Sequence, residues 1–222
     1  MVIIMAQIEI KNVTKIIKHN TVIDNVSLTV NSGKITGLKG VNGSGKTMLM
    51  RLVSGLILPT SGEIIIDGET LGKDITFPRS IGTLIENPAF LDNYSGFQNL
   101  KLLASIQGKI SDKEIREAII AVELNPDDKK KFRKYSLGMK QRLGIAAAVM
   151  EHPNIIILDE PTNALDSDGV QMVKRILQKE KERGALILIS CHDLDVLKEL
   201  SDVIYLMNVG RLSSYADKEG AQ

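Results

Sequence analysis

The chain carries the run Gly40-Val41-Asn42-Gly43-Ser44-Gly45-Lys46-Thr47, which fits the pattern G-x-x-x-x-G-K-[ST]. A short apolar segment, residues 35–38, precedes the run and has the character of a buried strand. Apolar residues then recur at helical spacing from Thr47 to Ile57. The run therefore predicts a glycine-rich loop that joins a buried strand to a helix, as in an α/β core.

This loop has the chemistry of a phosphate cradle. Glycines allow consecutive backbone N–H groups to turn toward an anion, and the following helix N-terminus adds roughly half a positive charge. Lys46 can reach the β- and γ-phosphates of a nucleoside triphosphate, and the Thr47 hydroxyl can ligate Mg²⁺. The alternative is a chance match on a glycine-rich turn. The remaining cradle residues are Gly40, Asn42, Gly43, Ser44 and Gly45.

Two carboxylates follow a second apolar strand, residues 154–158. Asp159 is placed to hold Mg²⁺, directly or through water. Glu160 is placed to polarise the water that attacks the γ-phosphate, and such general-base assistance is typically worth about 10²–10⁴-fold in rate. The alternative is a solvent-exposed acidic turn before Pro161.

His192 follows a third apolar strand, residues 185–189. A lone histidine after a strand is usually a cap or turn residue. However, ligands of open α/β sheets collect at the carboxyl ends of the strands. We therefore expect His192 to donate a hydrogen bond to the γ-phosphate.

Length and composition fit one globular domain. The 222 residues are 43% hydrophobic and 25% charged with a net charge of +1, which excludes disordered and collagen-like chains and gives no basic field for nucleic acid. The lone Cys191 cannot form an intramolecular disulfide, which suits a reducing compartment. The opening MVIIMAQIEIKN is too short an apolar run for a signal peptide, and no stretch has the roughly 18 apolar residues of a membrane helix. We expect a cytosolic chain.

The remaining patterns predict an α/β core interrupted by helices. A helical insert spans about residues 88–150, and the core spans about residues 1–87 and 151–222. Strands are predicted at residues 8–13, 26–30, 63–67 and 203–207. Helices are predicted at residues 97–106, 112–122, 139–150 and 169–182.

The segment Tyr135-Ser136-Leu137-Gly138-Met139-Lys140-Gln141-Arg142 makes the order of motifs diagnostic. Over essentially its whole length the chain resembles an ABC-transporter nucleotide-binding subunit, whose signature, usually LSGGQ, occupies this place at the start of a helix. Ser136, the Gly138 amide and the helix dipole would form a second anion-binding helix end. By the same resemblance Asp166 belongs to the D-loop and His192 is the switch histidine. The signature residues are Ser136, Leu137, Gly138 and Met139.

The resemblance implies a fold and a mechanism. The fold class is α/β: a P-loop NTPase (RecA-like) core with an N-terminal antiparallel β region and an inserted helical subdomain. ATP and Mg²⁺ are the implied cofactors. Two ATPase domains, identical or related, dock head to tail, so that each ATP lies between the cradle of one and the signature of the other. The pair would drive a membrane permease from the inner face of the cell membrane, with no nucleic acid expected as a partner.

Three positions depart from the family pattern. Glu86 stands where the family has its Q-loop glutamine, and its carboxylate could bind the metal more strongly than an amide. Ile17 stands at the position of the adenine-stacking aromatic residue, so that the base would rest on an aliphatic surface. Met48 replaces the usual second hydroxyl and removes a contact to the α-phosphate.

The strings IGTLIENPAFLDNYSGFQNLKLLA and YSLGMKQRLGIAAA resemble the bacitracin- and lantibiotic-resistance branch, in which Glu at the Q-loop position is typical. This resemblance suggests export of an antimicrobial peptide or a related amphiphile. The alternatives are a non-transport ATPase of the same superfamily that acts on a macromolecular complex, and a module that senses ATP without hydrolysing it. An ordinary phosphotransferase would lack the signature.

Overall fold

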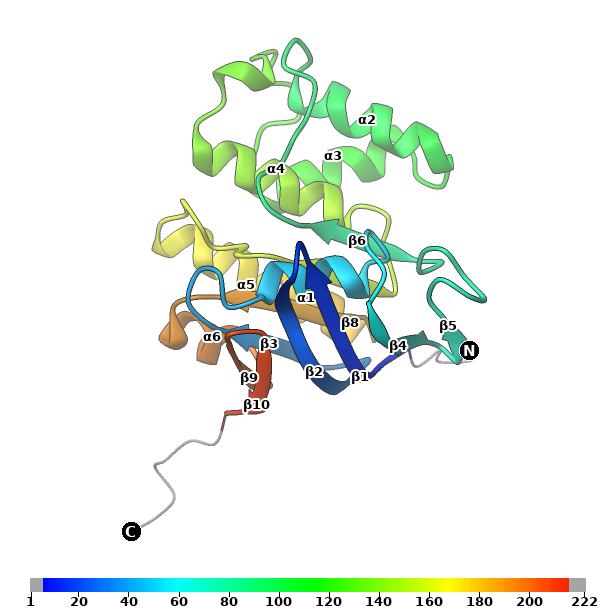
Figure 1. Ribbon diagram of the computed structural model, residues 1–222. Helices are drawn as coiled ribbons and strands as arrows, with labels where there is room; N and C mark the ends of the chain where they lie inside the picture. Colours follow the sequence, from blue (N-terminus) through cyan, green and yellow to red (C-terminus); the bar gives the residue numbers. More distant parts are fainter. Residues whose placement is uncertain (1–5, 216–222) are drawn as a thin grey trace.

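The computed structural model describes residues 6–215, so that the opening apolar run, residues 1–5, lies outside the described part (Figure 1). None of the helices within residues 6–215 has the length and apolar character needed to cross a bilayer. The strands are β1 (Gln7–Ile17), β2 (Asn20–Asn31), β3 (Ile35–Lys39), β4 (Ser61–Ile66), β5 (Glu69–Thr70), β6 (Ile81–Leu84), β7 (Ile155–Leu158), β8 (Leu186–Cys191), β9 (Val203–Asn208) and β10 (Arg211–Ser214). The helices are α1 (Lys46–Val53), α2 (Gly96–Gln107), α3 (Asp112–Ala121), the 3-10 turn η1 (Phe132–Lys134), α4 (Leu137–Val149), α5 (Ser167–Glu182) and α6 (Leu194–Leu200).

A six-stranded sheet forms the centre of the molecule, in the order β10-β9-β3-β8-β7-β6. The pairs from β9 to β6 are parallel, and β10 is antiparallel to β9. Every residue of β7 and β8 is buried, as expected of parallel strands that are covered on both faces. The carboxyl ends of β3, β7 and β8 therefore lie at one edge of the sheet.

Alternate residues of β7 face opposite layers. Ile156 and Leu158 belong to a hydrophobic cluster with the helices, whereas Ile155 and Ile157 belong to a cluster with α1 and the N-terminal strands. This alternation follows from the two-residue period of a strand. It places the central sheet between a helical layer and a mixed layer.

The second sheet is antiparallel and has the order β2-β1-β4-β5. Its apolar residues alternate with exposed ones and bury one face against α1 and β7. The predicted α/β core with an N-terminal antiparallel region is confirmed.

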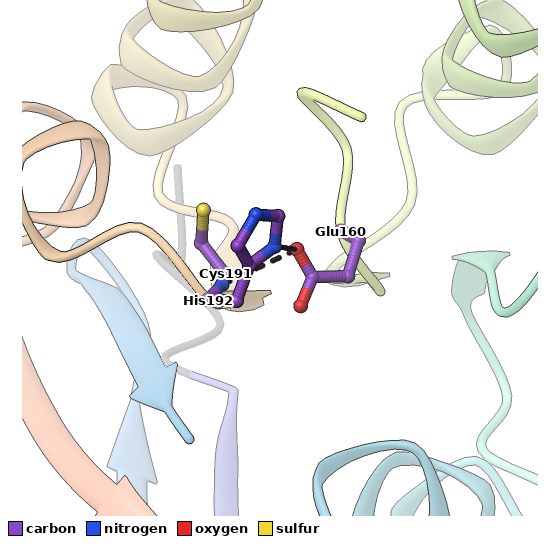
Figure 2. A group of neighbouring side chains, drawn as sticks. All are labelled: Glu160, Cys191 and His192. Atoms are coloured by element: carbon purple, nitrogen blue, oxygen red, sulfur yellow. Dashed lines mark hydrogen bonds and ion pairs between the residues drawn. The ribbon is translucent and has the colours of Figure 1, made fainter. Parts of the chain in front are cut away.

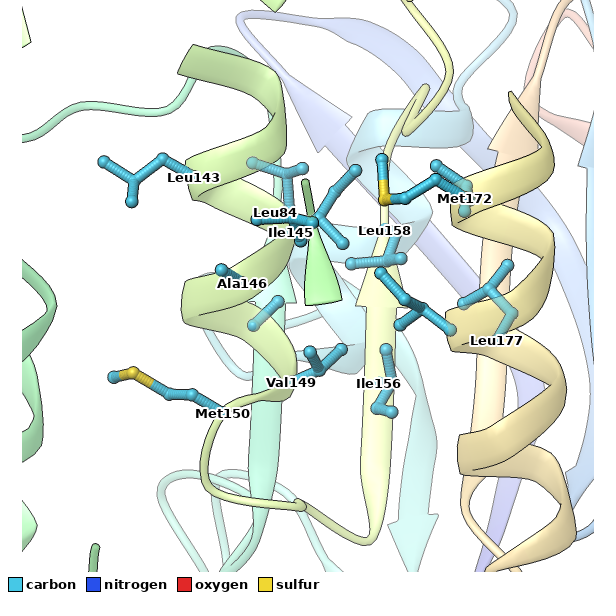
Figure 3. Close-up of a cluster of buried hydrophobic side chains, with 14 of the residues drawn as sticks. Leu84, Leu143, Ile145, Ala146, Val149, Met150, Ile156, Leu158, Met172 and Leu177 are labelled. Carbon is cyan, nitrogen blue, oxygen red and sulfur yellow. The ribbon is translucent and has the colours of Figure 1, made fainter. Parts of the chain in front are cut away.

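Helices α2 to α4 form the upper part of Figure 1. Capping boxes at Ser95 and Ser111 begin α2 and α3, because each serine accepts from the backbone of the third helical residue. Figure 3 shows α4 and α5 converging on β7, with Leu84 of β6 beside Ile145 of α4. The helices and the central sheet thus share one continuous hydrophobic cluster.

Three differences from the predicted elements have local causes. The helix expected to run to Ile57 ends at Val53, because Gly55 adopts a φ of 78° and turns the chain. β6 has only four residues, and only Leu84 among them is fully buried, so the sequence shows no strand pattern. α6 spans seven residues, which is too short for a helical period to be evident.

Candidate functional site

The glycine-rich loop links the end of β3 to the start of α1. Gly43 and Gly45 have φ angles of 81° and 111°, a region that disfavours other residues. At Gly40 a Cβ atom would lie 2.4 Å from the Ser44 Oγ. The backbone therefore closes into the predicted cradle only with glycine at these places.

Lys46 lies folded into this loop. Its Nζ donates a hydrogen bond of 2.6 Å to the carbonyl oxygen of Gly40 and lies 3.5 Å from Oε1 of Glu160. The side chain is only 6% exposed. The ammonium group is thus buried at the mouth of the cradle between a carbonyl and a carboxylate.

Thr47, in the first turn of α1, and Asp159, directly after β7, come together in the structure. The Thr47 hydroxyl donates to Oδ2 of Asp159 at 2.5 Å, and the Ser190 hydroxyl donates to Oδ1 of the same carboxylate. Asp159 directly follows β7 and is 6% exposed. The hydroxyl and the carboxylate offer hard oxygen ligands of the kind that Mg²⁺ prefers.

Glu160 and His192 form the next pair (Figure 2). Nδ1 of His192 lies 2.8 Å from Oε2 of Glu160, and the backbone N–H of His192 donates to the same oxygen at 3.3 Å. Cys191 lies on the other side of the His192 ring from Glu160 in Figure 2. It is buried, and its Sγ lies 3.8 Å from the Thr162 hydroxyl. Burial raises the pKa of the Cys191 thiol, which keeps it protonated and makes it a poor metal ligand.

A cavity of about 490 Å³ opens over the cradle. Ser44 and Glu160 line it. Among residues 6–215 the buried Ser44 Oγ has no hydrogen-bond partner, and the buried Glu160 Oε1 has only the Lys46 ammonium group, at 3.5 Å. A buried hydroxyl without a partner is expected where a polar ligand or water completes the site. The lining residues are Thr21, Val22, Asn42, Gly43, Ser44, Gly45, Lys46, Thr47, Met48, Arg51, Glu86, Asp159, Glu160, Val209 and Gly210.

Glu86 lines the same cavity but is engaged by a partner that the sequence did not reveal. Its Oε1 lies 2.7 Å from a guanidinium nitrogen of Arg51, on α1. Its backbone has a φ of 64°, in the left-handed region. The carboxylate predicted as a metal ligand is therefore paired with a cation of the helix that follows the cradle.

The two residues predicted near the nucleoside lie differently. Met48 lines the cavity, as expected from its place after Thr47. Ile17 is at the end of β1, 37% exposed, and lies outside the cavity lining, where Thr21 and Val22 of β2 stand instead. The aliphatic surface next to the cradle thus comes from β2 and from Val209.

The signature residues begin α4 and lie outside the lining of this cavity. Ser136 is the N-cap and accepts from the backbone N–H of Met139 at 3.2 Å, while Leu137 is 70% exposed. A Cβ on Gly138 would lie 3.0 Å from the carbonyl oxygen of Ala164, next to the segment that contains Asp166. Ser136 and Leu137 are therefore exposed at the N-terminal end of α4, whereas Gly138 and Met139 are partly buried.

Asp166 caps α5. Its Oδ1 accepts from the backbone N–H of Gly169 at 2.9 Å, and its side chain is 74% exposed. In this structure Asp166 therefore caps the N-terminus of α5, and its side chain is largely exposed.

The comparisons with known proteins agree with one another. The family model described as ABC transporter matches residues 23–163. The chain is 52% identical to YybJ, an ABC transporter ATP-binding protein of Bacillus subtilis, over 93% of this chain and 95% of that protein. It is 41% identical to the bacitracin transport ATP-binding protein BcrA of Enterococcus faecalis, over 96% of this chain and 70% of that one. It is 36% identical to the lantibiotic transport ATP-binding protein SrtF of Streptococcus pyogenes, over 97% of this chain and 93% of that one.

Solved structures resemble the fold closely. The ATP-binding cassette MJ0796, in a dimeric post-hydrolysis state bound to ADP and Pi, superimposes with a TM-score of 0.85 at 27% identity. The match covers 93% of this chain and 98% of that one. A second dimeric structure of the same cassette gives the same values.

Proposed function

The chain belongs to the ABC transporter ATP-binding family, and on this basis we propose that it works as one of two ATPase subunits that drive a membrane exporter. As a member of the family it binds ATP and hydrolyses it in a reaction coupled to transport. One observation supports the site assignment above the others. Lys46, Thr47, Asp159 and Glu160 line a single cavity, and His192 is bonded to Glu160. Ser44, which lines the same cavity, has a buried hydroxyl without a hydrogen-bond partner among residues 6–215.

The cradle would hold the triphosphate. Backbone N–H groups from Gly43 to Thr47 and the start of α1 supply positive potential without any side-chain charge. Lys46 would exchange its bond with the Gly40 carbonyl for oxygens of the β- and γ-phosphates. The buried Ser44 hydroxyl would gain a partner at the same time.

The residues also fit Mg²⁺. The Thr47 hydroxyl and the Asp159 carboxylate lie 2.5 Å apart and would hold the ion, with Glu86 as a third oxygen donor once it leaves Arg51. These residues would hold Mg²⁺, which would supply positive charge to offset the negative charge that develops on the phosphate in hydrolysis. Ser190, bonded to Asp159, would keep that carboxylate oriented.

Glu160 would act as the general base toward the attacking water. Glu160 lines the cavity, its Oε1 lies 3.5 Å from the Lys46 ammonium group, and its Oε2 is bonded to His192. A neutral imidazole donates from one nitrogen only. His192 can therefore bond both Glu160 and a γ-phosphate oxygen as a donor only when both ring nitrogens carry protons.

The signature would complete the partner's site. Residues 136–139 lie outside the cavity of their own subunit and begin α4, whose N-terminus favours anions. Docking of two subunits head to tail would bring this helix end onto the nucleotide of the other. The cassette MJ0796, which the chain resembles, is dimeric in its solved structures.

A permease and a peptide cargo complete the proposal. The relatives named for bacitracin and lantibiotic transport are 36–41% identical to this chain, which supports an antimicrobial peptide or a related amphiphile as the cargo. The permease would hold the pair at the inner face of the cell membrane. Stimulation of ATP turnover in the reconstituted complex by such a peptide tests the cargo assignment.

Glu160→Gln tests the shared-site arrangement. The amide cannot take the proton of the attacking water, so hydrolysis should fall by about 10²–10⁴-fold while nucleotide binding persists. Because ATP then stays in place, the variant should accumulate as a dimer in light scattering on addition of Mg·ATP. The matched control is Glu117→Gln, on the exposed face of α3, which should behave as the native chain. An ATP-saturated Glu160→Gln chain that remains monomeric contradicts the proposal.

A further inference from the structure

Glu160 holds an uncommon backbone conformation. Its φ of 49° lies in the left-handed region, which few residues with long side chains adopt. Such a conformation persists only where the surroundings determine it, and it is concentrated at functional sites. The groups that form hydrogen bonds with the backbone N–H and carbonyl of Glu160 are therefore part of the site.

Three hydrogen bonds hold this backbone. The N–H of Glu160 donates to the Ser190 hydroxyl of β8 at 3.0 Å. Its carbonyl oxygen accepts from the backbone N–H of Asn163 at 3.0 Å and from Nε2 of Gln141 at 3.0 Å. Gln141 alone among these donors comes from α4, the helix that begins at the signature.

Gln141 is suited to couple a movement of α4 to the backbone of Glu160. It is 7% exposed and lines a cavity of about 590 Å³ together with Glu86 and Glu160. It lies one helical turn after Leu137, and a turn of helix advances about 5.4 Å as a stiff unit. A displacement of the signature end of α4 therefore reaches the Glu160 carbonyl through one side chain.

We propose that Gln141 is a positioning residue that links the signature of each subunit to the catalytic carboxylate of the same subunit. The inference rests on the proposed function, in which the signature contacts the nucleotide held by the other subunit. α4 then touches the partner's nucleotide at its first turn and Glu160 of its own site at its second. ATP bound at one site thus affects the position of the catalytic Glu160 at the other site. Hydrolysis at the two sites is therefore cooperative.

Gln141→Met in the complex with its permease tests this link. Methionine keeps the length and apolar stem of the side chain but has no N–H to donate. We expect turnover to fall by about tenfold or more, because small displacements of a catalytic group carry rate penalties of up to about 10². The KM for ATP and the thermal unfolding midpoint should stay as in the native complex, and the Hill coefficient should fall from above 1 to 1.

A matched control and a second variant keep the outcome decisive. Gln171→Met, on the exposed side of α5, should leave turnover and the Hill coefficient unchanged. If Gln141→Met does not fold, Gln141→Asn keeps the amide but is one methylene too short to reach Glu160, and should show the same loss of turnover.

The failures of the two proposals are distinguishable. Native turnover in a folded Gln141 variant that still dimerises with ATP overturns the inference and leaves the proposed function intact. A native complex with a Hill coefficient of 1 also overturns the link between the sites. If Glu160→Gln stays monomeric with ATP, the proposed function itself fails.

Discussion

Lys46 is the residue on which the phosphate cradle depends. Its ammonium group is buried, bonded to the Gly40 carbonyl and close to the Glu160 carboxylate. A buried ammonium is stable only with such partners. Triphosphate oxygens offer stronger partners than the carbonyl does, because charge-assisted hydrogen bonds are about twice as strong as neutral ones.

Lys46→Ala should weaken ATP binding by about 10- to 100-fold, the equivalent of the 1.5–3 kcal/mol typical of a hydrogen bond to a charged group. Fluorescence titration with a labelled ATP analogue measures the dissociation constant. Lys109→Ala, an exposed lysine after α2, provides the control for the loss of one positive charge. Equal affinity in the two variants would overturn the cradle assignment.

The sequence does not predict residues whose role depends on a contact between distant segments of the chain. The cradle and the two carboxylates were predictable, because each is a short motif of adjacent residues. The structure brings them to one cavity. Gln141 and Ser190 were missed, because each meets Glu160 only after distant segments pack together. Arg51 was missed for the same reason, since nothing in the helix pattern indicates that it faces Glu86.

At the scale of elements, long periodic segments were predictable and short ones were not. The buried strands β7 and β8 and the amphipathic helix α5 follow directly from their apolar patterns. β6 was missed because it lies at the edge of the sheet and carries Gly82, where a Cβ would collide with the carbonyl of Ala148. Its glycine is explained by close packing on α4, which no local pattern encodes.

The ion pair between Arg51 and Glu86 joins α1 to the segment after β6. Thr47 and Arg51 are four residues apart on α1, hence on one face of the helix and about 6 Å apart along its axis. We therefore expect Glu86 to exchange between Arg51 and a metal held at Thr47. Both side chains are partly exposed, so exchanging the partner costs little.

Arg51→Met should release Glu86 toward the metal. The Mg²⁺ concentration at half-maximal nucleotide binding should fall by up to about fivefold, which corresponds to the upper end, about 1 kcal/mol, for an exposed ion pair. Glu86→Gln should raise that concentration, and adding Arg51→Met to it should have no further effect. Superimposed Mg²⁺ titrations of Arg51→Met and the native chain would contradict the exchange, and an equal shift in both backgrounds would mean that Arg51 acts on the nucleotide directly.

At the scale of the whole molecule, a single hydrophobic cluster runs from the helical region through the central sheet to α5 and α6. Hydrogen bonds and ion pairs at the edge of this cluster connect neighbouring elements. Asp202, between α6 and β9, accepts from the backbone N–H of Ile35 at 2.8 Å and from Lys181 of α5. Its own backbone N–H donates to the carbonyl oxygen of Ile35, so β3, β9 and α5 meet at one carboxylate.

Asp202 should therefore contribute stability that depends on pH. Burial by itself would raise the pKa of the Asp202 carboxyl, but the hydrogen bonds from Lys181 and Ile35 outweigh it and hold the pKa below the ordinary value of 3.8. Because the folded pKa is lowered, the unfolded chain takes up the proton first as the pH falls. The stabilisation is complete above the ordinary pKa and is lost as the pH falls through the folded one.

Asp202→Asn keeps the shape of the side chain and removes its charge. At neutral pH the free energy of unfolding should fall by about 1 kcal/mol, a value reduced by solvent screening because the side chain is 35% exposed. Denaturant unfolding at pH 7 and at pH 3 measures the difference between the native chain and the variant, which should shrink at the lower pH. Lys181→Met should lower stability at pH 7 as well and add little to Asp202→Asn, since both remove the same pair. A difference that stays constant between the two pH values would mean that the carboxylate does not titrate as the geometry requires.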